Sequence, residues 1–146
     1  MTKQQLKSDI RWIQRYDNYK KAFNLLKDAI KLKKISDIER AGLIQFFEMT
    51  FELAWKLLKD YLEAEGYTIK SPRDAIKTAY QSGIISQGHT WIDALKDRNM
   101  TVHTYEKKIA VEVEEKIKND YYQILSDLNY YFDQMIIKNN KNIEYE

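Results

Sequence analysis

Apolar side chains recur at steps of three and four residues along nearly the whole chain, and this spacing limits the possible fold more than any other feature. Such a period places the side chains on one face of an α-helix, whereas a half-buried strand would need strict alternation. The chain of 146 residues contains one proline and four glycines, so few residues interrupt the pattern. The sequence therefore predicts an all-α fold, an antiparallel up-and-down bundle of about five helices that forms a single domain over residues 1–146.

Capping signals divide the pattern into three long helices and two short ones. Ser36 with Glu39 forms a capping box, Ser71 precedes Pro72 at a helix start, and Thr90 is a further N-cap. The predicted helices cover residues 9–33, 36–65 and 71–83, then one that begins at Thr90 and one over 106–138, with 139–146 as a flexible polar tail. The apolar faces include Trp12, Tyr16, Tyr19, Phe23, Leu26 and Ile30 in the first helix, Ala75, Ile76, Ala79 and Tyr80 in the third, Trp91, Ala94, Leu95 and Val102 in the fourth, and Ile109, Val113, Ile117, Tyr121, Ile124, Leu128, Tyr131 and Met135 in the last.

Several classes of chemistry have no signature in this chain. There is no cysteine, and the two histidines are far apart, so we expect no disulfide, no zinc site and no bound metal or cofactor. Glycine-rich phosphate loops and the strand-turn-helix motif around a nucleophilic serine are absent. No apolar run reaches the roughly 20 residues of a membrane span, and the N-terminus lacks a signal peptide, so we expect a cytoplasmic protein without a membrane segment.

Charge is unevenly distributed along the sequence. Residues 1–34 hold ten basic and three acidic residues, a net charge of +7, whereas the rest of the chain has a net charge of −5. This segment is compatible with the solvated face of an amphipathic helix. Charge alone favours that interpretation, and the alternative is a surface that meets nucleic acid or an acidic partner.

One short stretch, residues 98–105, combines side chains that can process a phosphodiester; we call it the Arg-His-Tyr motif. It contains Arg98, His103 and Tyr105. A guanidinium binds phosphate oxygens, and an imidazole can accept or donate a proton near pH 7. A structural interpretation is also open, in which Arg98 pairs with Asp93 or Asp97 and His103 is an ordinary surface or cap residue.

The spacing of the motif restricts how its residues could act together. Five residues of continuous helix turn the chain by about 500°, so Arg98 and His103 would point about 140° apart. Either the helix breaks between them, or a second copy in a symmetric dimer completes the site. Thr104 favours the break because threonine is a good N-cap for the last helix.

Three blocks of the sequence resemble one protein family. Arg98-x4-His103-x-Tyr105 matches the RX4HXY motif of HEPN-domain proteins. Together with residues 46–56 (Phe-Phe-Glu-Met-Thr-Phe-Glu-Leu-Ala-Trp-Lys) and 71–74 (Ser-Pro-Arg-Asp), it is similar to the nucleotidyltransferase substrate-binding protein family.

The resemblance implies a helical homodimer that binds a minimal nucleotidyltransferase in a toxin–antitoxin pair. Within it, Arg98 and His103 become the catalytic pair of a metal-independent endoribonuclease that cleaves RNA. Asn99 and Thr104 support the motif, and Tyr105 becomes the site that the transferase adenylylates (AMPylation). The alternative is a non-catalytic subunit that presents substrate to the transferase or acts as its adaptor.

Overall fold

The computed structural model describes residues 2–145, with side chains up to Asn140, and its elements are all helical in that range. Their order is α1 (Lys3–Ala29), α2 (Asp37–Ala64), α3 (Pro72–Gln81), α4 (Gly88–Asn99), a 3₁₀ turn η1 (Thr101–His103), α5 (Lys107–Lys116), a π turn η2 (Ile117–Tyr121) and α6 (Tyr122–Tyr145). Because α5, η2 and α6 follow one another without a loop, the chain forms about five helical rods. The all-α bundle predicted from the sequence is confirmed.

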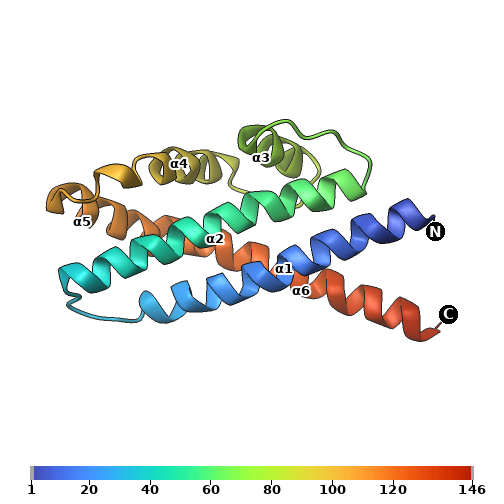
Figure 1. The fold of residues 1–146 in the computed structure, drawn as a ribbon, viewed down its shortest axis with the longest axis horizontal. Coiled ribbons are helices and arrows are strands. Elements are labelled where there is room, and N and C mark those ends of the chain that lie inside the picture. Colours follow the sequence, from blue (N-terminus) through green and yellow to red (C-terminus); the bar gives the residue numbers. More distant parts are fainter. Residues whose placement is uncertain (1, 146) are drawn as a thin grey trace.

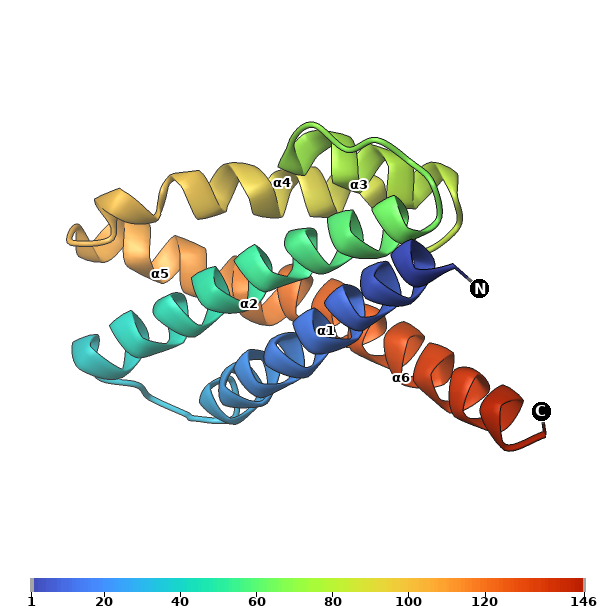
Figure 2. The same ribbon diagram turned by 45° about the vertical axis from the view of Figure 1, so that its right-hand side comes forward.

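The long helices α1 and α2 run antiparallel, and α5 to α6 crosses behind them (Figure 1). The short helices α3 and α4 lie on the side of α2 that faces away from α1 (Figures 1 and 2). The N-terminus and the C-terminal end of α6 are at the same end of the molecule in both figures. The α1–α2 loop and the turn between α4 and α5 share the opposite end. Helix α2 therefore has neighbours along much of its length. This explains why its buried side chains form a broad band around the helix.

The core follows the predicted apolar stripes with some exceptions. Five of the six stripe residues of α1 are buried, and the sixth, Ile30, is half-buried. Two buried tyrosines satisfy their hydroxyls across the bundle, and that of Tyr19 donates to the carbonyl of Leu125 over 2.6 Å. The predictions for Tyr80 and Val102 are wrong, since they are 56% and 72% exposed.

Local chemistry explains the helix ends. The capping box is present, with both the Ser36 and Glu39 side chains bonded to backbone N–H groups. Helix α1 begins six residues before the predicted start because Thr2 caps it, and it ends at Ala29 rather than residue 33. Gly66 follows α2 with a φ of 101°, the left-handed conformation that glycine adopts most easily.

Two predicted N-caps are wrong. Helix α4 begins at Gly88 because Gln87, with a φ of 55°, turns the chain straight into it, so Thr90 is already inside the helix. Helix α5 begins at Lys107 after Glu106, and the Thr104 hydroxyl instead donates to the carbonyl of Thr101 over 2.7 Å.

The last predicted helix is interrupted where the sequence pattern gives no warning. The π turn at Ile117–Tyr121 adds a residue to one turn. Leu125 and Phe132, which the predicted stripe did not include, are fully buried, whereas the predicted core residues Tyr131 and Met135 are half-buried. Helix α6 also continues past Lys138 to Tyr145. The flexibility predicted for 139–146 stays a prediction, and Glu146 lies outside the described residues.

Candidate functional site

The Arg-His-Tyr motif forms the corner between α4 and α5. Helix α4 ends at Asn99, and three residues of 3₁₀ helix reverse the chain before α5. The hydroxyl of Thr101 donates to the carbonyl of Arg98 over 2.8 Å, and the amide of His103 donates to the carbonyl of Met100 over 3.1 Å. The predicted break between Arg98 and His103 is therefore confirmed, although Thr101 rather than a cap at Thr104 stabilises it.

Arg98 is held from the side of α2. Its Nη2 donates to Oε2 of Glu52 over 3.0 Å, and both side chains are about one-third exposed. Its Nε is buried and has no hydrogen-bond acceptor among the described residues. The predicted structural partners were Asp93 and Asp97, and the observed partner is Glu52 instead.

Glu52 connects three side chains at this point. Its carboxylate accepts from the indole of Trp55 over 3.0 Å and lies 3.3 Å from the ammonium of Lys56. Partial burial would raise the pKa of Glu52, but the hydrogen bonds from Trp55 and Lys56 and the charge of Arg98 outweigh burial and lower it. Glu52 is consequently a charged, constrained support for Arg98.

The other side of the α4 end is held by the π turn. The hydroxyl of Tyr121 donates a hydrogen bond to Asp97, and Lys116 lies 3.3 Å from the same carboxylate. The Tyr121 ring is buried and stacks on Phe47 of α2. Burial first, and then the hydrogen bond to Asp97, raise the pKa of Tyr121 well above its ordinary value, so its hydroxyl keeps its proton.

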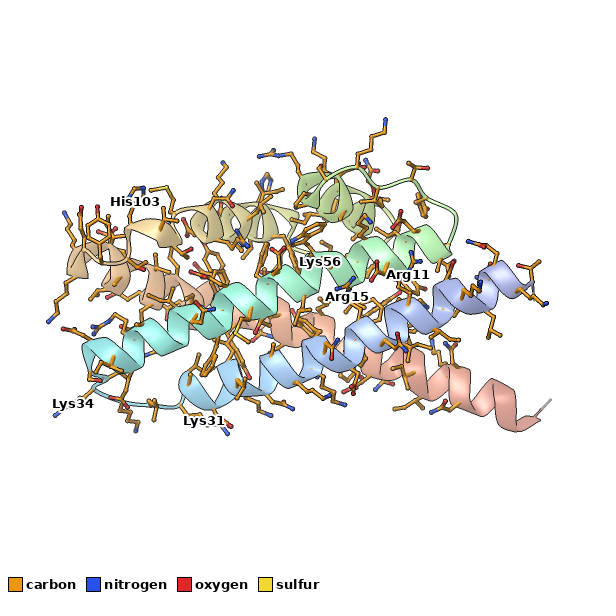
Figure 3. All side chains as sticks on the ribbon, in the orientation of Figure 1. Arg11, Arg15, Lys31, Lys34, Lys56 and His103 are labelled. Atoms are coloured by element: carbon orange, nitrogen blue, oxygen red, sulfur yellow. The ribbon has the colours of Figure 1, made fainter. Side chains whose placement is uncertain are left out.

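His103 and Tyr105 lie on the surface of the corner. Figure 3 shows His103 at the end of the bundle, and Tyr105 is 79% exposed. Their ring centroids are 6.5 Å apart. Neither side chain makes a hydrogen bond or ion pair with any other side chain that the structure describes, so both are accessible to a ligand.

A shallow hollow adjoins Tyr105. It has a volume of about 250 Å³, and Thr104, Tyr105 and Lys107 meet Asp37 and Arg40 from the first turn of α2 there. Arg40 bonds Glu114 of α5 over 2.7 Å and Asp37 over 2.9 Å. These contacts fix the start of α2 against the corner.

The structure brings only part of the predicted site together. No hydrogen bond joins Arg98 and His103 among the described residues, and Asn99 is exposed at the last position of α4. Sequence reasoning missed Glu52 and Tyr121 as supports of the motif. The only signal in the sequence that could have pointed to Glu52 is its place in the block 46–56.

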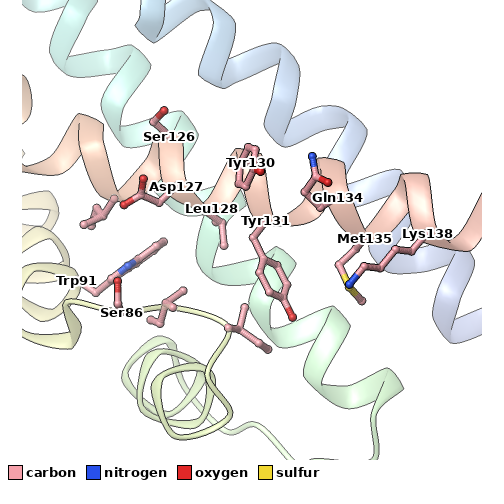
Figure 4. Close-up of a pocket in the computed structure, with 13 residues that line it drawn as sticks. Ser86, Trp91, Ser126, Asp127, Leu128, Tyr130, Tyr131, Gln134, Met135 and Lys138 are labelled. Carbon is pink, nitrogen blue, oxygen red and sulfur yellow. The ribbon is translucent and has the colours of Figure 1, made fainter.

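A larger groove lies away from the motif, and no motif residue lines it. Its volume is about 640 Å³, and it runs between α6 and the α3–α4 loop (Figure 4). Trp91 and Ser86 border it on one side, and Tyr131, Met135 and Lys138 of α6 on the other.

No group of three potential metal ligands occurs among the described residues, and none of their helices is long and apolar enough to cross a membrane.

Comparison with known proteins assigns the chain to a family. The model of the family described as "Nucleotidyltransferase substrate binding protein like" matches residues 14–134, which include Glu52, the whole corner and the π turn. The chain belongs to this family. The family resemblance predicted from the three sequence blocks is therefore confirmed.

One curated protein and one solved structure are similar to this chain over much of its length. A "Probable ribonuclease HepT" of Haemophilus influenzae is 30% identical over 84 residues, which are 54% of this chain and 58% of the relative. A crystal structure from Thermus thermophilus has a TM-score of 0.70 and 34% identity, covering 75% of this chain and 94% of that chain.

A second solved structure shares the fold. It is that of HI0074 from Haemophilus influenzae, described as the fold of a substrate binding domain of a nucleotidyltransferase. Its TM-score is 0.69 at 24% identity, and the match covers 79% of this chain and 96% of that chain. At this identity the likeness shows the fold alone.

Proposed function

We propose that this family member is the HEPN component of a HEPN/minimal nucleotidyltransferase pair and acts as a metal-independent endoribonuclease toxin. The observation that carries the proposal is the corner itself. An accessible imidazole at His103 follows a guanidinium at Arg98 that is held from α2, and a break in the helix separates them. The name of the Haemophilus influenzae relative, a probable ribonuclease, supports the same activity.

The chemistry follows from the side chains. The RNA 2′-hydroxyl attacks the adjacent phosphorus, the 5′-oxygen leaves, and the product ends in a 2′,3′-cyclic phosphate. His103 takes the proton of the 2′-hydroxyl or gives a proton to the leaving oxygen. Arg98 stabilises the negative charge that builds on the phosphorane-like transition state.

The two proton transfers explain why a homodimer is part of the proposal. Each protomer has one histidine in the corner, whereas the attack of the 2′-hydroxyl needs a base and the departure of the 5′-oxygen needs an acid. Two corners facing one another across a two-fold axis supply both, and each also supplies an arginine. Tyr105, exposed beside His103, is the acceptor for an adenylyl group from the transferase. The added bulk and negative charge would exclude RNA from the corner.

Expression of wild type and His103→Ala, with and without the transferase, tests the function. We expect growth arrest by wild type alone, relieved by His103→Ala or by the transferase. The purified protein should cleave RNA in the presence of EDTA and leave a cyclic phosphate. Intact RNA after prolonged incubation with correctly folded wild-type protein would contradict the ribonuclease.

The second candidate function is a non-catalytic adaptor that presents a substrate to the transferase. The groove of about 640 Å³ beside α6 favours it, because the groove is large enough for a small molecule and lies away from the motif. An adaptor would bind the transferase equally well after His103→Ala and would not arrest growth. Substitution of the groove residue Met135 by Trp should then impair the transferase reaction.

A further inference from the structure

The loop between α1 and α2 contains an unusual concentration of positive charge. Residues 31–34, Lys-Leu-Lys-Lys, hold three lysines and no acid; we call this segment the lysine turn. All three side chains are exposed. Lys31 lies 4.0 Å from Asp28, at the limit of an ion pair, and Lys33 and Lys34 have no acidic partner among the described residues.

The dipole of α1 does not account for this charge. Basic residues stabilise a helix within its last turn, and the effect fades beyond it. Helix α1 ends at Ala29 and already has Lys27 in its last turn. Lys33 and Lys34 lie four and five residues past the end, where they gain little from the dipole.

Lys34 also adopts a backbone conformation that a lysine does not favour. Its φ is 53°, in the left-handed region where glycine and asparagine are the usual residues. The loop could make the same turn with less strain if glycine stood there. A side chain kept at such a position suggests that its charge has a use apart from folding.

The lysine turn lies at the same end of the bundle as the Arg-His-Tyr corner (Figure 3). Asp37, three residues after Lys34, is 3.8 Å from Lys107 and lines the hollow next to Tyr105. Three residues span at most about 11 Å, so the turn ends close to the start of α2, which borders that hollow. Figure 3 shows Lys34 and His103 at the same end of the bundle, with His103 at its upper edge and Lys31 and Lys34 at its lower edge.

We propose that the lysine turn binds the phosphate backbone of RNA at the same end of the bundle as the corner and guides the strand toward His103. This inference rests on the proposed ribonuclease function and adds a substrate-binding surface outside the motif. Lysines that contact phosphates release counterions from the nucleic acid, so they contribute affinity that salt weakens and that does not depend on sequence.

Binding of a fluorescent single-stranded oligoribonucleotide by a variant set tests the proposal. The set uses His103→Ala as background, so that the RNA stays intact. Replacing Lys31, Lys33 and Lys34 by glutamine should weaken binding about tenfold and reduce the slope of log affinity against log salt by about 2, at roughly 0.7 per lysine. The matched control replaces Lys3, Lys7 and Lys70, three exposed lysines at the far end of the bundle, and should change affinity less than twofold.

Single substitutions of Lys34 distinguish an effect on RNA binding from an effect on folding. Lys34→Gly should raise the unfolding midpoint by about 1–4 °C because it relieves the left-handed conformation, and should still weaken RNA binding. Lys34→Arg should keep the affinity. A variant that loses stability and affinity together would indicate a structural role and overturn the proposal.

Three further outcomes are decisive. Equal effects of the two lysine sets would overturn the proposal, because binding would then follow net charge alone. Unchanged RNA affinity with lost binding of the transferase would assign the turn to a protein partner and also overturn it. If wild type binds RNA through the lysine turn but never cleaves it, the surface stands and the proposed ribonuclease fails.

Discussion

Arg98 and Glu52 are 46 positions apart in the chain and form an ion pair of 3.0 Å between the end of α4 and the middle of α2. The pair fixes Nη2 of the guanidinium, whose Nε is buried, while the Arg98 side chain stays about one-third exposed. Asp97, the preceding residue, is held on the other side by Tyr121. The end of α4 is thus supported from α2 and from the π turn, which gives the corner a defined geometry.

Glu52→Ala should reduce RNA cleavage roughly 10- to 100-fold, because a displaced catalytic group costs about that much. The free energy of unfolding should fall by less than about 1 kcal/mol, since the pair is partly exposed. Single-turnover cleavage and urea unfolding measure the two effects. Glu63→Ala, which breaks a comparable 3.1 Å pair with Lys59, is the control and should cleave normally. Wild-type cleavage by Glu52→Ala would show that Arg98 needs no such support.

Tyr121→Phe should lower the free energy of unfolding by about 1–2 kcal/mol, because it removes a hydrogen bond to a charged carboxylate and keeps the stacking on Phe47. Urea unfolding followed by circular dichroism measures the loss. Tyr130→Phe is the control, since that tyrosine is 67% exposed, and its stability should stay unchanged. Equal stability of the two variants would mean that water replaces the Tyr121 hydroxyl at no cost.

Stability should decline at acidic pH in a way that depends on Glu52 and Glu114. Partial burial raises the pKa of each carboxyl group, but hydrogen bonds from cationic neighbours outweigh burial and lower both pKa values in the folded state. At Glu52 the hydrogen bond from Trp55 also lowers the pKa. A lowered pKa adds stability that is fully present above the unfolded value of about 4.3 and is lost as the pH falls through the folded value. Urea unfolding between pH 7 and pH 3 should show this loss. Glu114→Gln should flatten the curve below pH 4.5, and an unchanged curve would contradict the assignment.

Tyr105→Phe should leave RNA cleavage within about twofold of wild type, because the hydroxyl makes no hydrogen bond among the described residues and lies at the rim of the corner. Incubation with the transferase and ATP should add the mass of an AMP group to wild type and not to Tyr105→Phe, as intact-protein mass spectrometry can show. The exposed Tyr130 is the comparison, and its phenylalanine variant should still be modified. Modification of Tyr105→Phe would place the acceptor elsewhere.

Much of the fold could be predicted because its causes are local. The stripe Trp12, Tyr16, Tyr19 identified the buried face of α1, and the Ser36–Glu39 capping box marked the start of α2 correctly. Both signals act over three or four residues, the range in which a helix brings side chains together. The helix break between Arg98 and His103 was likewise predictable from the sequence, although the residue chosen as the cap was wrong.

The support of the candidate site could not be predicted in the same way. Nearness in the sequence indicates only Asp93 and Asp97 as partners of Arg98, whereas the pair with Glu52 depends on how α4 packs on α2. The π turn, whose Tyr121 donates a hydrogen bond to Asp97, has no local signal in an otherwise regular helical pattern. The sequence by itself determined the helices, their buried faces and the motif residues. Only the tertiary structure decided their partners, because those contacts join residues far apart in the chain and form only when the helices pack.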